Sequence, residues 1–189
     1  MNASILCNGG SLLTEKRTFF EQVANRVFAN PTVAQMWAKR TAEKTANFVD
    51  LSSGIPFAQL RRPLHECKVA LITTGGIHLP DQPPFDMENP DGDPSYREIP
   101  GDVDPKQITI THKYYDHSDA DKDLNVIFPL EHFRDLASKG VVYELNHRHF
   151  GFMGHIDNAL VETLNQWKAP EIAAKLRADG VDFAFLTPA

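Results

Sequence analysis

Cysteine is scarce in this chain, and the scarcity excludes two kinds of architecture. Cys7 and Cys67 are the two cysteines among 189 residues. Two thiols cannot build a disulfide framework, and they cannot by themselves supply a four-thiolate zinc or iron–sulfur site. Neither belongs to a Cys-x-x-Cys pair or lies beside an evident activating helix start, so both are interpreted as buried or incidental cysteines.

Long apolar runs are also missing. The longest are residues 69–72 and 183–186, far below the roughly 18 residues that a membrane span requires. Residues 1–13 lack a basic flank and are interrupted by Asn8, Gly9 and Gly10, so they do not have the form of a secretory signal. We therefore expect a cytoplasmic protein, and its length corresponds to one compact domain.

An excess of positive charge is absent too, which argues against nucleic acid as a partner. The net charge of −6 is unevenly divided. Residues 1–68 carry nine basic and five acidic side chains, whereas residues 69–125 carry four and twelve. Seven of the 13 prolines lie from Pro80 to Pro105, so the acidic middle of the chain differs from regular core structure.

Helical patterns occupy the basic N-terminal third. Phe19, Val23 and Val27 recur at four-residue spacing and predict a helix over 14–29. Asn30 followed by Pro31 is a helix start signal and predicts a second helix over 31–47. We expect residues 1–67 to form a helical extension that packs on a core domain of residues 68–189, or on a second subunit.

The core alternates between strand and helix patterns. The spacing predicts an irregular stretch over 77–107, strands over 69–74, 108–111, 124–128, 141–145 and 181–187, and helices over 130–137, 156–167 and 170–179. This order predicts an α/β fold with a mostly parallel sheet flanked by helices, Rossmann-like or flavodoxin-like. Ligands bind outside the carboxyl ends of such strands, which selects residues 73–78, 146–155 and 187–189.

The turn after the first core strand is a candidate substrate-binding element. Thr73, Thr74, Gly75 and Gly76 offer hydroxyls and unhindered backbone N–H groups to an anion such as a carboxylate or phosphate, and His78 follows closely. The spacing matches neither a dinucleotide fingerprint nor a phosphate-binding loop. A tight turn between a strand and a loop is the alternative.

Histidines are concentrated in two polar segments. His147 and His149 would face the same way on an extended chain, and His155 follows them. His112 and His117 lie in the acidic stretch from residue 112 to residue 123. We expect these segments to converge at the strand ends as an acid–base or metal site.

Two assignments of these histidines remain open. In the first, His117 and His149 are catalytic proton donors and Asp116 orients His117. In the second, a divalent metal ion is bound by three side chains, namely His112, His147 and His155. A solvated acidic loop with unrelated surface histidines is the alternative to both.

Four stretches of the chain resemble one protein family. They are ALITTGGIHLPDQPPFDMENPDGDPSYREIP ending at Pro100, THKYYDHSDADKDLNVIFPLEHFRDLASKG ending at Gly140, FGFMGH ending at His155, and GVDFAFLTP ending at Pro188. On these residues the chain resembles the glycine/sarcosine/betaine and D-proline reductase selenoprotein B family. The resemblance covers about residues 69–188, and the N-terminal helical region contributes little to it.

The resemblance implies a component that works with partner subunits in reductive cleavage of a C–N bond in a small amino acid or its N-methylated form. It implies a pyruvoyl group on a partner subunit that activates the amine. It also implies a selenocysteine or cysteine on this component that attacks the carbon bearing the nitrogen. Such a group is anionic near neutral pH and can be released by thiol exchange.

The sequence departs from the family pattern at its end. The redox residue of the family follows the segment matched by Leu186, Thr187 and Pro188, in a selenocysteine/cysteine-x-x-Cys arrangement, whereas this sequence stops at Ala189. Either a selenocysteine codon was read as a stop, or the chain is a short member without the redox residue. Two further hypotheses are a His-ligated metalloenzyme without selenol chemistry and a non-catalytic assembly subunit. A homo-oligomer is expected in each case.

Overall fold

The computed structural model of the chain describes residues 30–33, 35–36, 39–40 and 58–189. The backbone N–H of Thr32 donates to Oδ1 of Asn30 at 3.0 Å, so the predicted helix start at this asparagine is confirmed. The described residues that follow it up to residue 40 are helical. The predicted helix over 14–29 lies outside the described residues, so a helical pair is not confirmed. The division into residues 1–67 and 68–189 stays a prediction.

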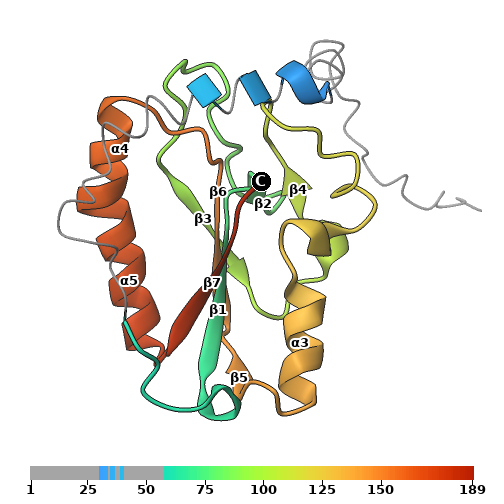
Figure 1. Cartoon of the computed structure of the whole chain (residues 1–189), viewed down its shortest axis with the longest axis vertical. Helices are drawn as coiled ribbons and strands as arrows, with labels where there is room; N and C mark the ends of the chain where they lie inside the picture. Colours follow the sequence, from blue (N-terminus) through green and yellow to red (C-terminus); the bar gives the residue numbers. More distant parts are fainter. Residues whose placement is uncertain (1–29, 34, 37–38, 41–57) are drawn as a thin grey trace, which may run out of the picture.

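A five-stranded mixed sheet forms the centre of the molecule (Figure 1). Its central strand is β1 (Lys68–Thr73), and β7 (Phe183–Thr187) runs parallel to it on one side. On the other side β5 (Glu144–Leu145) and β6 (Arg148–Phe152) run parallel to the two ends of β1. The edge strand β3 (Tyr96–Pro100) is antiparallel to β6. As the continuous apolar run predicts, β1 is covered on both faces.

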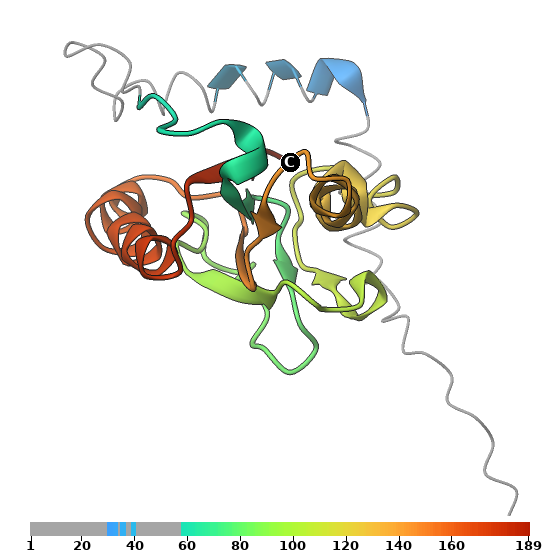
Figure 2. The same cartoon turned by 90° about the horizontal axis from the view of Figure 1, so that it is seen from below.

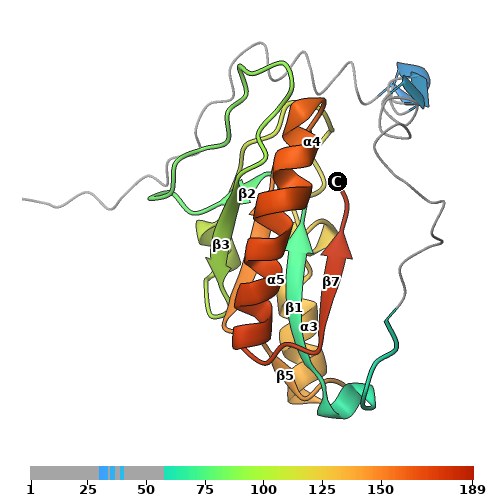
Figure 3. The same ribbon diagram turned by 90° about the vertical axis from the view of Figure 1, so that its left-hand side faces the viewer.

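Helices lie on both faces of the sheet, as Figure 2 shows. On one face lies α3 (Leu130–Ser138). On the other, α4 (Ala159–Thr163), a π-helical turn (Leu164–Lys168) and α5 (Ala169–Ala178) form one continuous run beside β1 and β7 (Figure 3). The α/β architecture is therefore confirmed, but the sheet is mixed and a Rossmann-like or flavodoxin-like strand order is not confirmed. Within the described part of the chain, no helix has the length and apolarity that crossing a bilayer requires.

The alternating side chains of β1 build a core on each face. Val69 and Leu71 belong to the cluster under α3, together with Phe128 and Phe133. Ala70 belongs to the cluster under α5, whose buried members also include Phe150, Phe152, Ile172 and Leu176. Burial of each large apolar side chain stabilises the folded state by about 1.5–3 kcal/mol. These two layers therefore hold β1 between the helices and fix the position of its ends.

Residues 77–107 contain more regular structure than the sequence predicts. β2 (Ile77–His78) pairs antiparallel with β4 (Thr109–Ile110), and a short 3₁₀ turn spans Pro105–Gln107. The edge strand β3 also lies in this stretch. Within β3 only Ile99 is fully buried, so the strand has no alternating apolar pattern by which it could be recognised.

One predicted strand and one predicted loop need correction. The segment 124–128 is not a strand, because Leu124–Val126 forms a 3₁₀ turn whose start is capped by the Asp123 carboxylate. The segment 146–155, predicted as a loop beyond a strand, contains β6 itself. His147 therefore precedes β6 and His149 lies within it, so residues 153–155 are the part that follows the carboxyl end of this strand.

Candidate functional site

The turn after β1 ties together the carboxyl ends of three parallel strands. The N–H of Thr74 donates to the carbonyl of Thr187 at 3.2 Å, and the N–H of Gly76 donates to that of Phe152 at 2.7 Å. The N–H of Gly75 donates to Oγ1 of Thr73 at 3.1 Å. These bonds engage the N–H groups of Thr74, Gly75 and Gly76 in the chain without ligand. Substrate binding by this turn stays a prediction.

Two glycines let the neighbouring segments approach this turn. Gly76 has φ +70°, and an added Cβ would lie 2.5 Å from the carbonyl oxygen of Thr111. Gly154, just after β6, has φ +86°, and its Cβ would lie 2.8 Å from the carbonyl oxygen of Thr74. A side chain at either position would be strained and would also collide with backbone. The glycines thus hold residues 111–117 and 153–155 against the end of β1.

Five aromatic rings from these two segments lie in consecutive contact, and we call them the ring row. Its members in order are His117, Tyr115, His112, Tyr114 and His155. The centroid distances along the row are 5.5, 4.7, 5.9 and 4.5 Å. The hydroxyl of Tyr115 donates to the carbonyl of Gly75 at 3.1 Å, which attaches the row to the turn after β1.

His112, at the centre of the ring row, is held in the neutral state. Its Nδ1 accepts the backbone N–H of Tyr114 at 3.0 Å, and the residue is 8% exposed. Burial, followed by the nearby His117 and His155, lowers the pKa of His112 to about 4, although a hydrogen bond to the backbone of Met153 acts in the opposite direction. A neutral ring in this position can accept or donate a hydrogen bond without adding charge to the site.

His117, at one end of the ring row, has a carboxylate partner that differs from the predicted one. Its Nδ1 lies 3.2 Å from Oδ1 of Asp121, and the His117 side chain is 7% exposed. Asp116 is exposed, and its Oδ1 accepts the N–H of Ser118 at 3.0 Å. The assignment of Asp116 as the orienting residue is therefore corrected: it caps a local turn, and Asp121 contacts the imidazole.

The other end of the ring row touches the acidic, proline-rich loop of residues 79–95. His155 lies 3.5 Å from the Asp157 carboxylate through Nε2, and its carbonyl accepts the N–H of Asp93 at 3.2 Å. Lys113, which lies between His112 and Tyr114 in the sequence, donates to the carbonyl of Met87 and to the Glu88 carboxylate at 2.9 and 2.8 Å. The loop is thus fastened to both segments that carry the ring row.

Arg97 on β3 holds the opposite end of this loop, and its removal should loosen it. The guanidinium donates to the carbonyls of Pro83 and Pro84 at 2.8 and 3.1 Å and lies 4.3 Å from the Phe85 ring centroid. Arg97→Ala should accelerate cleavage after Glu88 by a glutamate-specific protease several-fold, because about 1–2 kcal/mol of local stability is lost. Arg177→Ala, on the exposed face of α5, is the matched control, and equal cleavage of the two variants would contradict the role of Arg97.

Two predicted site histidines have buried structural contacts. His78 places Nδ1 2.8 Å from the carbonyl of Leu79 and Nε2 2.8 Å from the Thr111 hydroxyl. His149 is fully buried, and its Nδ1 accepts the N–H of Leu71 at 3.0 Å. This N–H lies where β1 passes from pairing with β5 to pairing with β6. The His149 imidazole therefore replaces a backbone partner at an irregular point of the sheet, whereas His78 joins the residues that follow β2 and β4.

The predicted metal trio is not assembled. His112 and His155 belong to the ring row, whereas His147 precedes β6 and lies 3.8 Å from the Asp179 carboxylate beside α5. In residues 58–189 and the shorter described ranges before them, no three histidine, cysteine or acidic side chains are grouped closely enough to bind a metal ion. The arrangement offers imidazole–carboxylate pairs rather than a ligand set.

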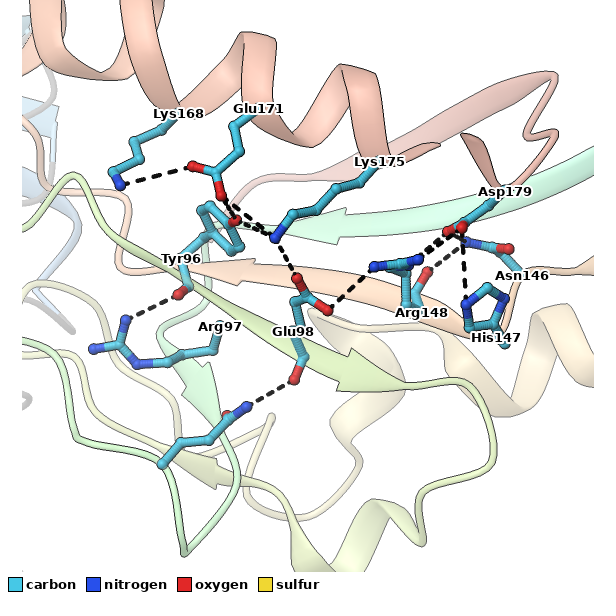
Figure 4. Close-up of polar contacts among 11 residues, drawn as sticks. Tyr96, Arg97, Glu98, Asn146, His147, Arg148, Lys168, Glu171, Lys175 and Asp179 are labelled. Atoms are coloured by element: carbon cyan, nitrogen blue, oxygen red, sulfur yellow. Dashed lines mark hydrogen bonds and ion pairs between the residues drawn. The ribbon is translucent and has the colours of Figure 1, made fainter. Parts of the chain in front are cut away.

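A second polar cluster fastens α5 to the sheet, as Figure 4 shows. Nζ of Lys175 donates to the hydroxyl of Tyr96 and to the Glu98 carboxylate, each at 2.6 Å. These hydrogen bonds, to Glu98 first and Tyr96 second, raise the pKa of Lys175. Arg148 donates to both oxygens of Asp179, at 2.6 and 2.8 Å. Since this cluster joins β3 and β6 to α5, we assign it a structural role.

Sequence reasoning missed three residues of the site, namely Tyr114, Tyr115 and Asp121. The tyrosines lie between His112 and His117, so an alternation of histidine and tyrosine could have indicated stacked rings. Asp121 follows His117 by four residues, the spacing that brings side chains together in a helical turn. The chain does make such a turn, because the N–H of Asp121 donates to the carbonyl of His117 at 2.8 Å.

Comparison with known proteins gives two matches. The sequence profile of the glycine/sarcosine/betaine reductase selenoprotein B family matches residues 29–189. The D-proline reductase subunit gamma of Acetoanaerobium sticklandii is 32% identical over 140 residues, which cover 74% of this chain and 56% of that protein. The chain thus aligns with little more than half the length of this relative. No solved structure matches the chain.

Proposed function

The chain belongs to the glycine/sarcosine/betaine reductase selenoprotein B family, and from this premise we propose that it binds a small amino-acid-like substrate for reductive C–N cleavage together with partner subunits. The substrate would lie at the carboxyl ends of β1, β6 and β7. The observation that carries this proposal is the attachment of the ring row to the turn after β1 through Tyr115. Acid–base groups are thereby gathered at the end of parallel strands, where α/β folds bind ligands.

The chain end after β7 also belongs to this region. The N–H of Ala189 donates to Oγ1 of Thr74 at 3.1 Å, so the backbone that follows β7 is held at the turn after β1. The resemblance implies that the redox residue of the family follows Pro188. When present, a selenol or thiol there would supply the nucleophile that displaces the nitrogen.

Cys67 does not fit this redox role. It lies before the amino end of β1, opposite the ring row, and it is fully buried. Burial, followed by the negative charge of Asp182, raises the pKa of its thiol, whereas a redox nucleophile requires a lowered one. No step of the proposed reaction is therefore assigned to this cysteine.

We assign His117 the task of protonating the departing nitrogen. The nitrogen leaves with the electron pair of the C–N bond, so a positioned acid accelerates its departure. His117 has a carboxylate partner and lies in the ring row. His149, the other predicted donor, is fully buried against the Phe128 ring within β6, at a centroid distance of 5.8 Å, and we propose that it stabilises the sheet instead.

His117→Gln should reduce turnover by at least about a hundredfold, the lower end of the range typical of a lost acid–base group. Binding of D-proline, glycine, sarcosine and betaine to the chain with its partner subunits would be measured by isothermal titration calorimetry, and amine release by a coupled assay. His132→Gln replaces an exposed imidazole on α3 and should change neither. Equal binding and turnover in the two variants would exclude His117 from the site.

A further inference from the structure

The side chains of His117 and Asp121 meet within one compact turn of the acidic segment. Nδ1 and Oδ1 are 3.2 Å apart, and the backbone N–H of Asp121 donates to the carbonyl of His117 at 2.8 Å. Ala120, between them, is 5% exposed and belongs to the core under α3. The turn is therefore anchored in the core, and the carboxylate is held beside the imidazole.

We infer that Asp121 is a positioning residue that orients His117 for proton transfer, an inference that rests on the proposed function. Because a carboxylate can only accept, Nδ1 of His117 must carry the proton that it donates to Asp121. This bond fixes the tautomer and directs acid–base chemistry to Nε2. The negative charge also stabilises the protonated ring, which is the form that a proton donor requires.

The other carboxylates of the segment have different tasks. Asp116 caps the turn at Ser118. Asp119 pairs with Lys122 at 2.8 Å. Asp123 caps the 3₁₀ turn before α3. Among the four acids from residue 116 to residue 123, the contact with the imidazole thus belongs to Asp121, although Asp116 is nearer to His117 in sequence.

The two rings next to His117 in the ring row bring no negative charge to it. The Tyr115 ring packs on the imidazole at a centroid distance of 5.5 Å, while its hydroxyl donates to Gly75. His112, next in the ring row, is neutral above about pH 4 because burial lowers its pKa. The charge nearest the imidazole in these contacts is that of Asp121, so its removal should alter the titration of His117.

The test compares isosteric variants by NMR titration of the His117 ring in the whole chain without ligand. Asp121→Asn keeps a hydrogen-bond acceptor but removes the charge, and it should lower the pKa of His117 by about 0.5–1. Asp116→Asn and Asp119→Asn remove the same charge from the same segment and should leave that pKa within about 0.2. Asp121→Glu should restore most of the change.

The outcomes separate this inference from the proposed function. Equal His117 titration in the Asp121→Asn and Asp116→Asn variants would overturn the positioning role of Asp121, whatever the substrate. If Asp121→Asn shifts the titration as expected, the inference further requires turnover at neutral pH to fall several-fold with little change in KM. A shifted titration with unchanged turnover would overturn the catalytic part. Failure of His117→Gln to affect turnover, with the titration shift intact, would exclude both His117 and Asp121 from the reaction, whereas the absence of substrate binding by the native chain with its partner subunits would reject the proposed function.

Discussion

Lowering the pH from 7 to 5 is expected to reduce the free energy of unfolding by about 3–4 kcal/mol. Two buried imidazoles cause this effect, because the folded protein holds each of them neutral. His112 is 8% exposed and His149 is fully buried. The pKa of each is lowered to about 4 from the ordinary value of 6.5, chiefly by burial.

The direction follows from the protons bound by each state. Between pH 6.5 and about pH 4 the unfolded chain protonates both imidazoles, whereas the folded chain does not. Stability is therefore fully present above pH 6.5 and is lost as the pH falls toward 4. At pH 5 each group accounts for about 2 kcal/mol of lost stability. Near this pH the change of the unfolding free energy with pH corresponds to about two protons taken up on unfolding.

Urea unfolding at several pH values would measure this loss. The variant His149→Gln would separate the contribution of His149 from that of His112. A glutamine can still accept the N–H of Leu71 that Nδ1 accepts in the native chain, but it does not titrate. We expect the variant to be less stable at pH 7 by about 1–2 kcal/mol because its packing differs. The number of protons that the variant takes up on unfolding near pH 5 should fall to about one. A native slope near zero between pH 7 and pH 5 would show that these rings are not buried in the neutral form.

The same histidine illustrates why part of the fold could not be read from the sequence. β1, α3 and β7 were predicted because each has its own apolar pattern or stop signal. β6 carries Arg148, His149 and Gly151 among five residues, which is not an ordinary strand pattern. Its glycine is required by packing, since an added Cβ would lie 2.6 Å from the carbonyl oxygen of Ile77. Tertiary contacts, not local propensity, define this strand.

The candidate site divides in a similar way. The turn after β1 and the region following β7 were predicted from the rule that strand ends bind ligands, and they do lie together through Thr74. The pairing of His117 with Asp121 rather than Asp116 depends on how the segment turns. Adjacent residues point apart in most backbone conformations, so proximity in sequence is a poor guide to which carboxylate meets an imidazole.

Asp179→Ala is expected to destabilise the fold by about 2 kcal/mol, because it removes the acceptor that Arg148 and Asn146 share. The carboxylate is 5% exposed, and it accepts from Nε and Nη2 of Arg148 and from Nδ2 of Asn146. The value lies below that of a fully buried ion pair because the Arg148 side chain is 28% exposed. Asp135→Ala, which breaks an exposed pair with Lys139 on α3, should cost less than about 0.5 kcal/mol.

Protonation of Asp179 causes a second loss of stability, at a lower pH than the loss caused by the two histidines. Burial alone would raise the pKa of this carboxyl, but the hydrogen bonds from Arg148 and Asn146 outweigh burial and lower it below 3.8. Its contribution is thus present above pH 3.8 and is lost as the pH falls through the lowered pKa, below the histidine window.

A double-mutant cycle distinguishes the ion pair from simple packing. The double variant Arg148→Met with Asp179→Ala removes both charges, so it should lose less stability than the sum of the losses in Arg148→Met alone and Asp179→Ala alone. A double variant that loses the sum of the two single effects would mean that Asp179 acts without Arg148. In that case the attachment of α5 to the sheet would depend on Lys175 and its bonds to β3.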